Sequence, residues 1–227
     1  MKMCLEQHRI WGTAGRTAMF LFAMAGCCLY APVLAAGEVI KLAVSDSQGV
    51  YQVALEMILN APVNDVYAVI TDYAHIYRVD SSIVESKILD APDPSVTRVK
   101  TVINDCVLSF CRDIRRVEDV RQVGDHNIYA VIVPQLSNVR SGATHWQLYP
   151  IGDKTRINYD MTLEPGFFVP PLVGDYLVEK KIKEETLSCF NNIERIARLH
   201  RERTKAQGST LNEKRPKGAI SEHDNAN

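Results

Sequence analysis

The sequence has no excess of charge of either sign. Its 227 residues include 26 Lys and Arg and 27 Asp and Glu, which leaves a formal net charge of −1. Proteins that bind nucleic acids usually carry a strongly basic domain or stripe, so this balance argues against a nucleic-acid partner. Aromatic residues are few, at 7% of the chain, but 46% of the residues are hydrophobic. That apolar fraction is typical of a globular protein and excludes a fibrous or wholly disordered chain.

The sequence also lacks the short motifs of several common chemistries. It contains no nucleophile elbow, no His-rich metal motif and no Gly-rich phosphate-binding loop. His145 is a candidate general base, with Glu164 or Asp72 as its orienting acid, but strand alternation places it opposite Trp146 and away from an interior. His75 has the surroundings of a solvated surface residue. We therefore predict no catalytic residue, no metal and no cofactor, and the sequence favours a binding protein over an enzyme.

The first 36 residues have the pattern of an export signal. Three basic residues precede an uncharged run over 17–37, which ends in small residues. This pattern predicts a signal peptide over 1–36 that is cleaved. A retained membrane anchor is one alternative, because 21 uncharged residues are long enough to cross a bilayer. A lipoprotein signal is another, because residues 24–27 resemble the lipobox, in which Cys27 would be acylated and become the new N-terminus.

All three versions export the rest of the chain, so we expect a periplasmic location, either free or tethered to a membrane. Loss of the leader removes three basic residues and one acidic residue, which moves the formal net charge from −1 to −3. A mildly acidic exported domain is a poor partner for DNA or a ribosome.

The cysteines divide between the leader and the exported part. Three of the six lie in the leader, which leaves Cys106, Cys111 and Cys189. An extended strand would hold the first two about 17 Å apart, beyond the roughly 4.4–6.8 Å that a disulfide allows between Cα atoms. They can pair only if the chain turns at 107–110, and the alternating flanks suit a hairpin. In an oxidising periplasm we predict a Cys106–Cys111 disulfide, with Cys189 as a buried free thiol.

The order of the predicted elements indicates one α+β domain over 50–203. A first strand is followed by two short helices, six more strands and a long amphipathic helix over 173–203. We expect a short linker over 37–49 and a disordered tail over 204–227, where large apolar side chains are almost absent. The predicted strands cover 50–59, 83–89, 95–105, 112–121, 127–133, 142–148 and 155–163.

Three segments resemble a known superfamily. Residues 60–73 (NAPVNDVYAVITDY) are similar to the first-helix motif of the START-like branch that includes the coenzyme Q-binding START proteins and the polyketide cyclase/dehydrase families. Residues 141–150 (SGATHWQLYP) resemble that branch's strand with a Trp followed by a Pro, and residues 155–159 resemble its next strand. The resemblance covers about residues 50–200. It implies the helix-grip fold, in which a curved antiparallel sheet of about seven strands surrounds a long C-terminal helix.

A sheet that grips a helix leaves a cavity suited to an apolar ligand. Strand alternation selects side chains that share its inner face, and aromatic residues of the second short helix and of the loop before the long helix are placed at its ends. For each aliphatic residue, the alternative is that it simply packs in the core. The loop before the long helix either gates the cavity or acts as a plug that packs the helix onto the sheet. The candidates are Tyr51, Val53, Leu55, Tyr73, Tyr77, Trp146, Ile157, Tyr159, Met161, Phe167 and Phe168.

We therefore expect a monomer that binds or transports a hydrophobic or amphipathic small molecule, such as a lipid or a quinone, in the cell envelope. The basic end of the long helix is favourable to the helix dipole, and contact with an anionic membrane surface is the alternative. One alternative is a cyclase/dehydrase-type enzyme that acts on a hydrophobic substrate. Another is an envelope interaction module whose cavity is filled.

Overall fold

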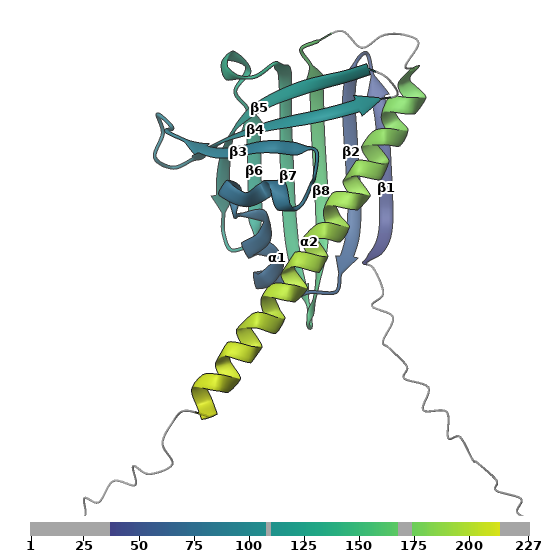
Figure 1. The fold of residues 1–227 in the computed structure, drawn as a ribbon. Helices are drawn as coiled ribbons and strands as arrows, with labels where there is room; N and C mark the ends of the chain where they lie inside the picture. The colour runs from purple at the N-terminus through teal and green to yellow at the C-terminus, as the bar shows by residue number, and fades with distance from the viewer. Residues whose placement is uncertain (1–36, 108–109, 168–173, 214–227) are drawn as a thin grey trace, which may run out of the picture. The chain divides into compact units, whose positions relative to one another are not determined.

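The computed structural model describes residues 37–107, 110–167 and 174–213 (Figure 1). These residues form a single sheet, a long helix and three short helical segments. The strands are β1 (Glu38–Ser47), β2 (Val50–Leu59), β3 (Ile83–Leu89), β4 (Thr97–Val107), β5 (Phe110–Val123), β6 (Asn127–Ile132), β7 (Val139–Ile151) and β8 (Lys154–Pro165). The helical segments are α1 (Val63–Ile70), η1 (Tyr73–Arg78), η2 (Pro134–Leu136) and α2 (Gly174–Glu213).

The sheet is open and antiparallel throughout, in the order β1-β2-β8-β7-β6-β5-β4-β3. Tight turns join β1 to β2, β5 to β6 and β7 to β8, and Gly124 and Gly152 supply the positive φ angles that the last two of these turns require. After β2, the chain passes through α1 and η1 to the opposite edge of the sheet. The sheet curves so that β3, β4 and β5 run across the direction of β1, β2 and β8, and α2 crosses its inner side (Figure 1).

The predicted fold class is confirmed, with two differences in the elements. Residues 37–49, predicted as a linker, hold β1, so the sheet has eight strands. This edge strand alternates poorly because its register shifts between Val39 and Lys41 and most of its side chains are exposed. The second short helix has 3-10 geometry, with a kink at His75.

The core lies between the sheet and α2. Phe190, Ile193 and Ala197 from the helix are almost completely buried against side chains from the inner face of the sheet and from α1. By contrast, no side chain over 176–189 is fully buried, and the helix is mostly exposed again over 199–207. The helix is therefore anchored to the core near its middle.

The ends of the chain differ partly from expectation. Helix α2 continues to Glu213, so the first ten residues of the predicted disordered tail are helical. The rest of that tail, the predicted leader and the alternative lipidation site at Cys27 lie outside the described residues. No helix in the described part of the chain is both long enough and apolar enough to span a membrane.

The structure contains the predicted disulfide between Cys106 and Cys111. The two residues face each other in the register of β4 and β5, one position before the end of the paired strands. The bridge therefore closes the β4–β5 hairpin beside its turn.

Replacing both bridged cysteines with Ser is expected to lower the free energy of unfolding by about 2 kcal/mol, because the bridge restricts a short loop in the unfolded chain. Urea unfolding of the oxidised protein, followed by circular dichroism, measures the change. We expect dithiothreitol to lower the stability of the unsubstituted protein and to leave that of the double variant unchanged. Equal unfolding midpoints for oxidised and reduced protein would contradict this prediction.

Candidate functional site

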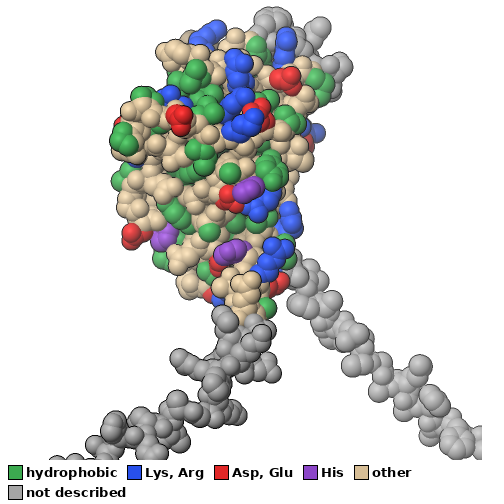
Figure 2. Space-filling model, turned by 60° about the vertical axis from the view of Figure 1, so that its left-hand side comes forward, with side chains coloured by type: hydrophobic (Ala, Val, Ile, Leu, Met, Phe, Trp, Pro, Cys, Tyr) green, Lys and Arg blue, Asp and Glu red, His purple; other side chains and the backbone are tan. Residues whose placement is uncertain are grey.

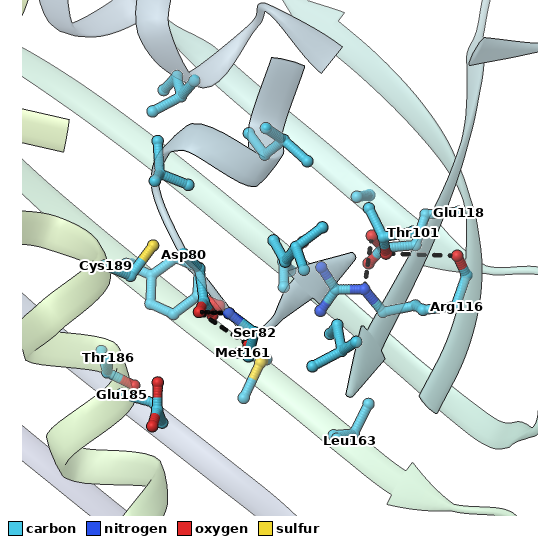
Figure 3. A pocket seen from close by; sticks show the side chains of 18 of the residues that line it. Asp80, Ser82, Thr101, Arg116, Glu118, Met161, Leu163, Glu185, Thr186 and Cys189 are labelled. Carbon is cyan, nitrogen blue, oxygen red and sulfur yellow. Dashed lines mark hydrogen bonds and ion pairs between the residues drawn. The ribbon is translucent and has the colours of Figure 1, made fainter. Parts of the chain in front are cut away.

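A cavity of about 290 Å³ lies between the inner face of the sheet and the amino-terminal half of α2. Strands β4 to β8 supply its floor, and η1 with the segment that follows it supplies one side (Figure 3). Most of the lining is apolar, with Ile, Val and aromatic side chains from both the sheet and the helix. A cavity of this kind is suited to an apolar or amphipathic small molecule.

Four of the sequence candidates line this cavity: Tyr73, Trp146, Tyr159 and Met161. The ring centroids of Trp146 and Tyr159 are 4.5 Å apart. Both rings pack on Phe190 of α2, with centroid distances of 5.2 Å for Trp146 and 5.3 Å for Tyr159. Phe190 also lines the cavity and was not among the candidates. The aromatic side chains thus form one wall where the sheet meets the helix.

The other candidates lie elsewhere. Four of them are buried in the core and do not line the cavity; they are Tyr51, Val53, Leu55 and Ile157. Tyr77 is 47% exposed and does not close the cavity. Phe167 is half-buried away from the lining, and Phe168 lies outside the described residues.

Sequence reasoning missed a charged pair inside the cavity. Arg116 and Glu118 alternate with outward-facing residues of β5, so both project inward (Figure 3). The Arg116 Nε atom lies 3.0 Å from Glu118 Oε2. Glu118 is 8% exposed, and its charge raises the pKa of Arg116, which keeps the guanidinium positive. The apolar residues Ile114 and Val120 on the same strand face were the signal that could have revealed this pair.

A second group of charged side chains lies at one edge of the cavity. It consists of Asp105, Lys181 and Glu185, and we call this edge the rim. Lys181 Nζ of α2 is 3.0 Å from Asp105 of β4 and also pairs with Glu185 one turn along the helix. These hydrogen bonds raise the pKa of Lys181. The three side chains are 27–36% exposed, so they lie where the cavity meets solvent. Because Asp105 adjoins Cys106, the disulfide-closed hairpin contacts α2 at this rim.

Cys189 also lines the cavity, and it is a free thiol as predicted. Burial raises its pKa to about 12, so the reactive thiolate is scarce at neutral pH. We expect Cys189 to react with iodoacetamide at least ten times more slowly in the native protein than in urea, with a rate that rises with pH. Mass spectrometry of peptides measures both rates. Similar rates in the two states would contradict the burial of this thiol.

The candidate catalytic side chains do not enter the cavity. His145 projects from the outer face of β7, where it stacks on Tyr129 with ring centroids 4.0 Å apart. Glu164 accepts hydrogen bonds from Arg140 and Ser141, and the Arg140 bond lowers its pKa. His75 pairs with Asp72 at 2.7 Å on the surface. Among the described residues, no cluster of His, Cys, Asp or Glu is arranged to hold a metal ion.

On the face that Figure 2 shows, the outer surface has no strongly charged patch that could serve as a binding site in place of the cavity. Lys and Arg side chains are interspersed there with Asp and Glu, and histidines lie beside acidic side chains. The structure pairs two exposed histidines with acidic side chains in this way: His75 with Asp72 and His200 with Asp65. This face therefore has no single-sign patch of the kind that binds nucleic acid.

Solved structures with this fold come from several bacteria. TTHA0849 from Thermus thermophilus is 17% identical, with a TM-score of 0.55 over 66% of this chain and 98% of that one. The Zhui aromatase/cyclase from a Streptomyces species is 12% identical, with a TM-score of 0.54 over 66% and 94%. A START superfamily protein from Mycobacterium smegmatis is 14% identical, with a TM-score of 0.50 over 64% and 98%. These likenesses show the fold.

No curated protein sequence matches the chain. The model of the family described as polyketide cyclase/dehydrase and lipid transport matches residues 51–194, which span β2 to the middle of α2. That match covers more than half of the chain and includes the described cavity between sheet and helix. The chain therefore belongs to the polyketide cyclase/dehydrase and lipid transport family, whose fold binds hydrophobic molecules or supports cyclase chemistry.

Proposed function

We propose that this protein binds or carries a hydrophobic or amphipathic small molecule, such as a lipid or a quinone-like compound, in the cell envelope and without covalent chemistry. The observation that carries the proposal is the apolar cavity of about 290 Å³ between the sheet and α2. The export-like pattern of the first 36 residues supports the envelope location. An envelope carrier fits both features because a lipid needs shelter from water when it leaves a membrane.

Native mass spectrometry of the protein purified from the cell envelope tests this proposal. We expect a small hydrophobic molecule to co-purify with the protein. Ala130→Phe should remove it, because Ala130 lines the cavity and a ring would fill the space. Ala143→Phe is the matched control, since Ala143 lies on the outer face of the neighbouring strand. An empty protein that takes up no hydrophobic probe would support an interaction module instead.

A cyclase/dehydrase-type enzyme is the second candidate, and the inward carboxylate of Glu118 favours it. Such an enzyme needs an acid or base inside the cavity, and a buried carboxylate can play either part. The likeness to a solved structure named as an aromatase/cyclase is compatible with this version. Incubation of the recovered ligand with the protein separates the two functions. A change of mass or ring pattern that Glu118→Gln abolishes would establish the enzyme, whereas an unchanged ligand supports the carrier.

A further inference from the structure

The cavity offers hydrogen-bond donors that have no acceptor in the described part of the protein. The terminal guanidinium nitrogens of Arg116 are free of partners among these residues, because Glu118 pairs at Nε. Neither the Tyr159 hydroxyl nor the Trp146 indole N–H has a hydrogen-bond partner among the described residues. All three side chains line the same apolar space. An apolar occupant would displace water from these donors and leave them without an acceptor, which is costly, so an occupant that supplies acceptor oxygens is favoured.

The charges around the cavity act against a negative occupant. Arg116 and Lys181 are the basic side chains of its described lining, whereas Asp80, Glu118 and two rim residues are acidic. The lining therefore carries a formal charge of −2. Both cations already face carboxylates, at 3.0 Å in each case. A ligand carboxylate at Arg116 would have to share the guanidinium with Glu118 in a poorly solvated space, where repulsion is only weakly screened.

We infer that the cavity selects an uncharged hydrophobic molecule with carbonyl, ester or ether oxygens, and that it discriminates against fatty carboxylates. This inference rests on the proposed function, because it names the ligand class of the same cavity. The acceptor oxygen pairs with Arg116, Tyr159 or Trp146, and the apolar part lies along the Ile and Val side chains of the lining. Neutral acceptors satisfy the free donors without adding charge, whereas an anion adds a third unit to a lining that is already negative.

Binding of three matched probes to the full chain tests the inference: a twelve-carbon methyl ketone, the fatty carboxylate of equal length, and the alkane. Trp11 lies in the predicted leader, so Trp146 of the cavity wall is the one Trp reporter of the exported protein, and Trp11→Phe gives the same reporter where the leader is retained. At mildly alkaline pH we expect the ketone to bind roughly tenfold or more tightly than the carboxylate, and more tightly than the alkane. Equal or tighter binding of the carboxylate would overturn the inference and leave the proposed function standing. Failure of all three probes would count against both.

Charge-removing variants test whether the lining causes this preference. Glu118→Gln should strengthen binding of the fatty carboxylate several-fold and so reduce the difference in affinity between the ketone and the carboxylate. Glu185→Gln at the rim should act in the same direction, and it keeps the test open if Glu118→Gln fails to fold. Asp160→Asn removes an exposed carboxylate from the outer face of β8 and is the matched control. A preference that neither lining variant narrows would contradict the electrostatic basis of the inference.

Discussion

Phe190→Ala is expected to lower the free energy of unfolding by about 3–5 kcal/mol, because it removes a large side chain from a packed core. Phe190 is 1% exposed and holds the middle of α2 against Trp146 and Tyr159. Its loss would join new empty space to the cavity and remove both ring contacts. Urea unfolding at equilibrium measures the effect.

Phe190→Leu provides the control for this prediction. It preserves most of the apolar volume, so we expect a loss of less than about 1.5 kcal/mol. Leu199→Ala, on an exposed part of α2, should change stability little. A small effect of Phe190→Ala would mean that α2 is held to the sheet by other contacts than those of its anchored middle.

Arg116→Met is expected to destabilise the protein by about 3–5 kcal/mol, because it leaves the charge of Glu118 buried without its partner. The two groups are 3.0 Å apart, and Glu118 is 8% exposed. The guanidinium also contributes hydrogen-bond donors to the cavity, so ketone binding should weaken in the same variant. Thermal and urea unfolding measure the first effect, and Trp146 fluorescence measures the second.

The combined variant Arg116→Met with Glu118→Leu distinguishes the effect of losing the whole ion pair from the effect of losing one partner. Replacement of a whole buried ion pair by apolar side chains is often nearly neutral for stability, so this protein should recover most of the loss. It should still bind the ketone more weakly than the unsubstituted protein does, because the guanidinium donors are absent. A double-mutant cycle with Glu118→Leu gives the coupling energy. Additive losses without recovery would show that the pair does not stabilise the fold as a unit.

The order of elements was predictable because strands β2 to β8 alternate or carry apolar runs between clear turn signals. Strand β1 was not, because an exposed edge strand buries too few side chains to impose a regular pattern: Val39 and Ile40 are both exposed. The predicted end of α2 comes too early for a related reason. Beyond residue 203 the helix has no apolar face that a sequence pattern could detect.

The cavity was predicted in kind but only partly in composition. Alternation identified Trp146, Tyr159 and Met161 correctly as inward-facing residues. It could not separate them from Val53 or Leu55, which face the same side but belong to the packed core that includes Phe190 and Ile193 of α2. The distinction depends on where the helix crosses, which is a long-range property. Arg116 and Glu118 were missed because charged side chains on a strand normally face solvent.

Because α2 is anchored to the core only near its middle, we expect different parts of the helix to open with different free energies. Amide hydrogens near Phe190 and Ile193 should exchange only through global unfolding, because these residues belong to the core. Those over 176–189 cover the cavity without a fully buried side chain, so they should exchange through local opening at a lower free energy. Under the proposed function, we expect ligand entry to require the opening of a few turns of helix and of the rim ion pairs, and not global unfolding. A ligand could exchange many times during the lifetime of one folded molecule.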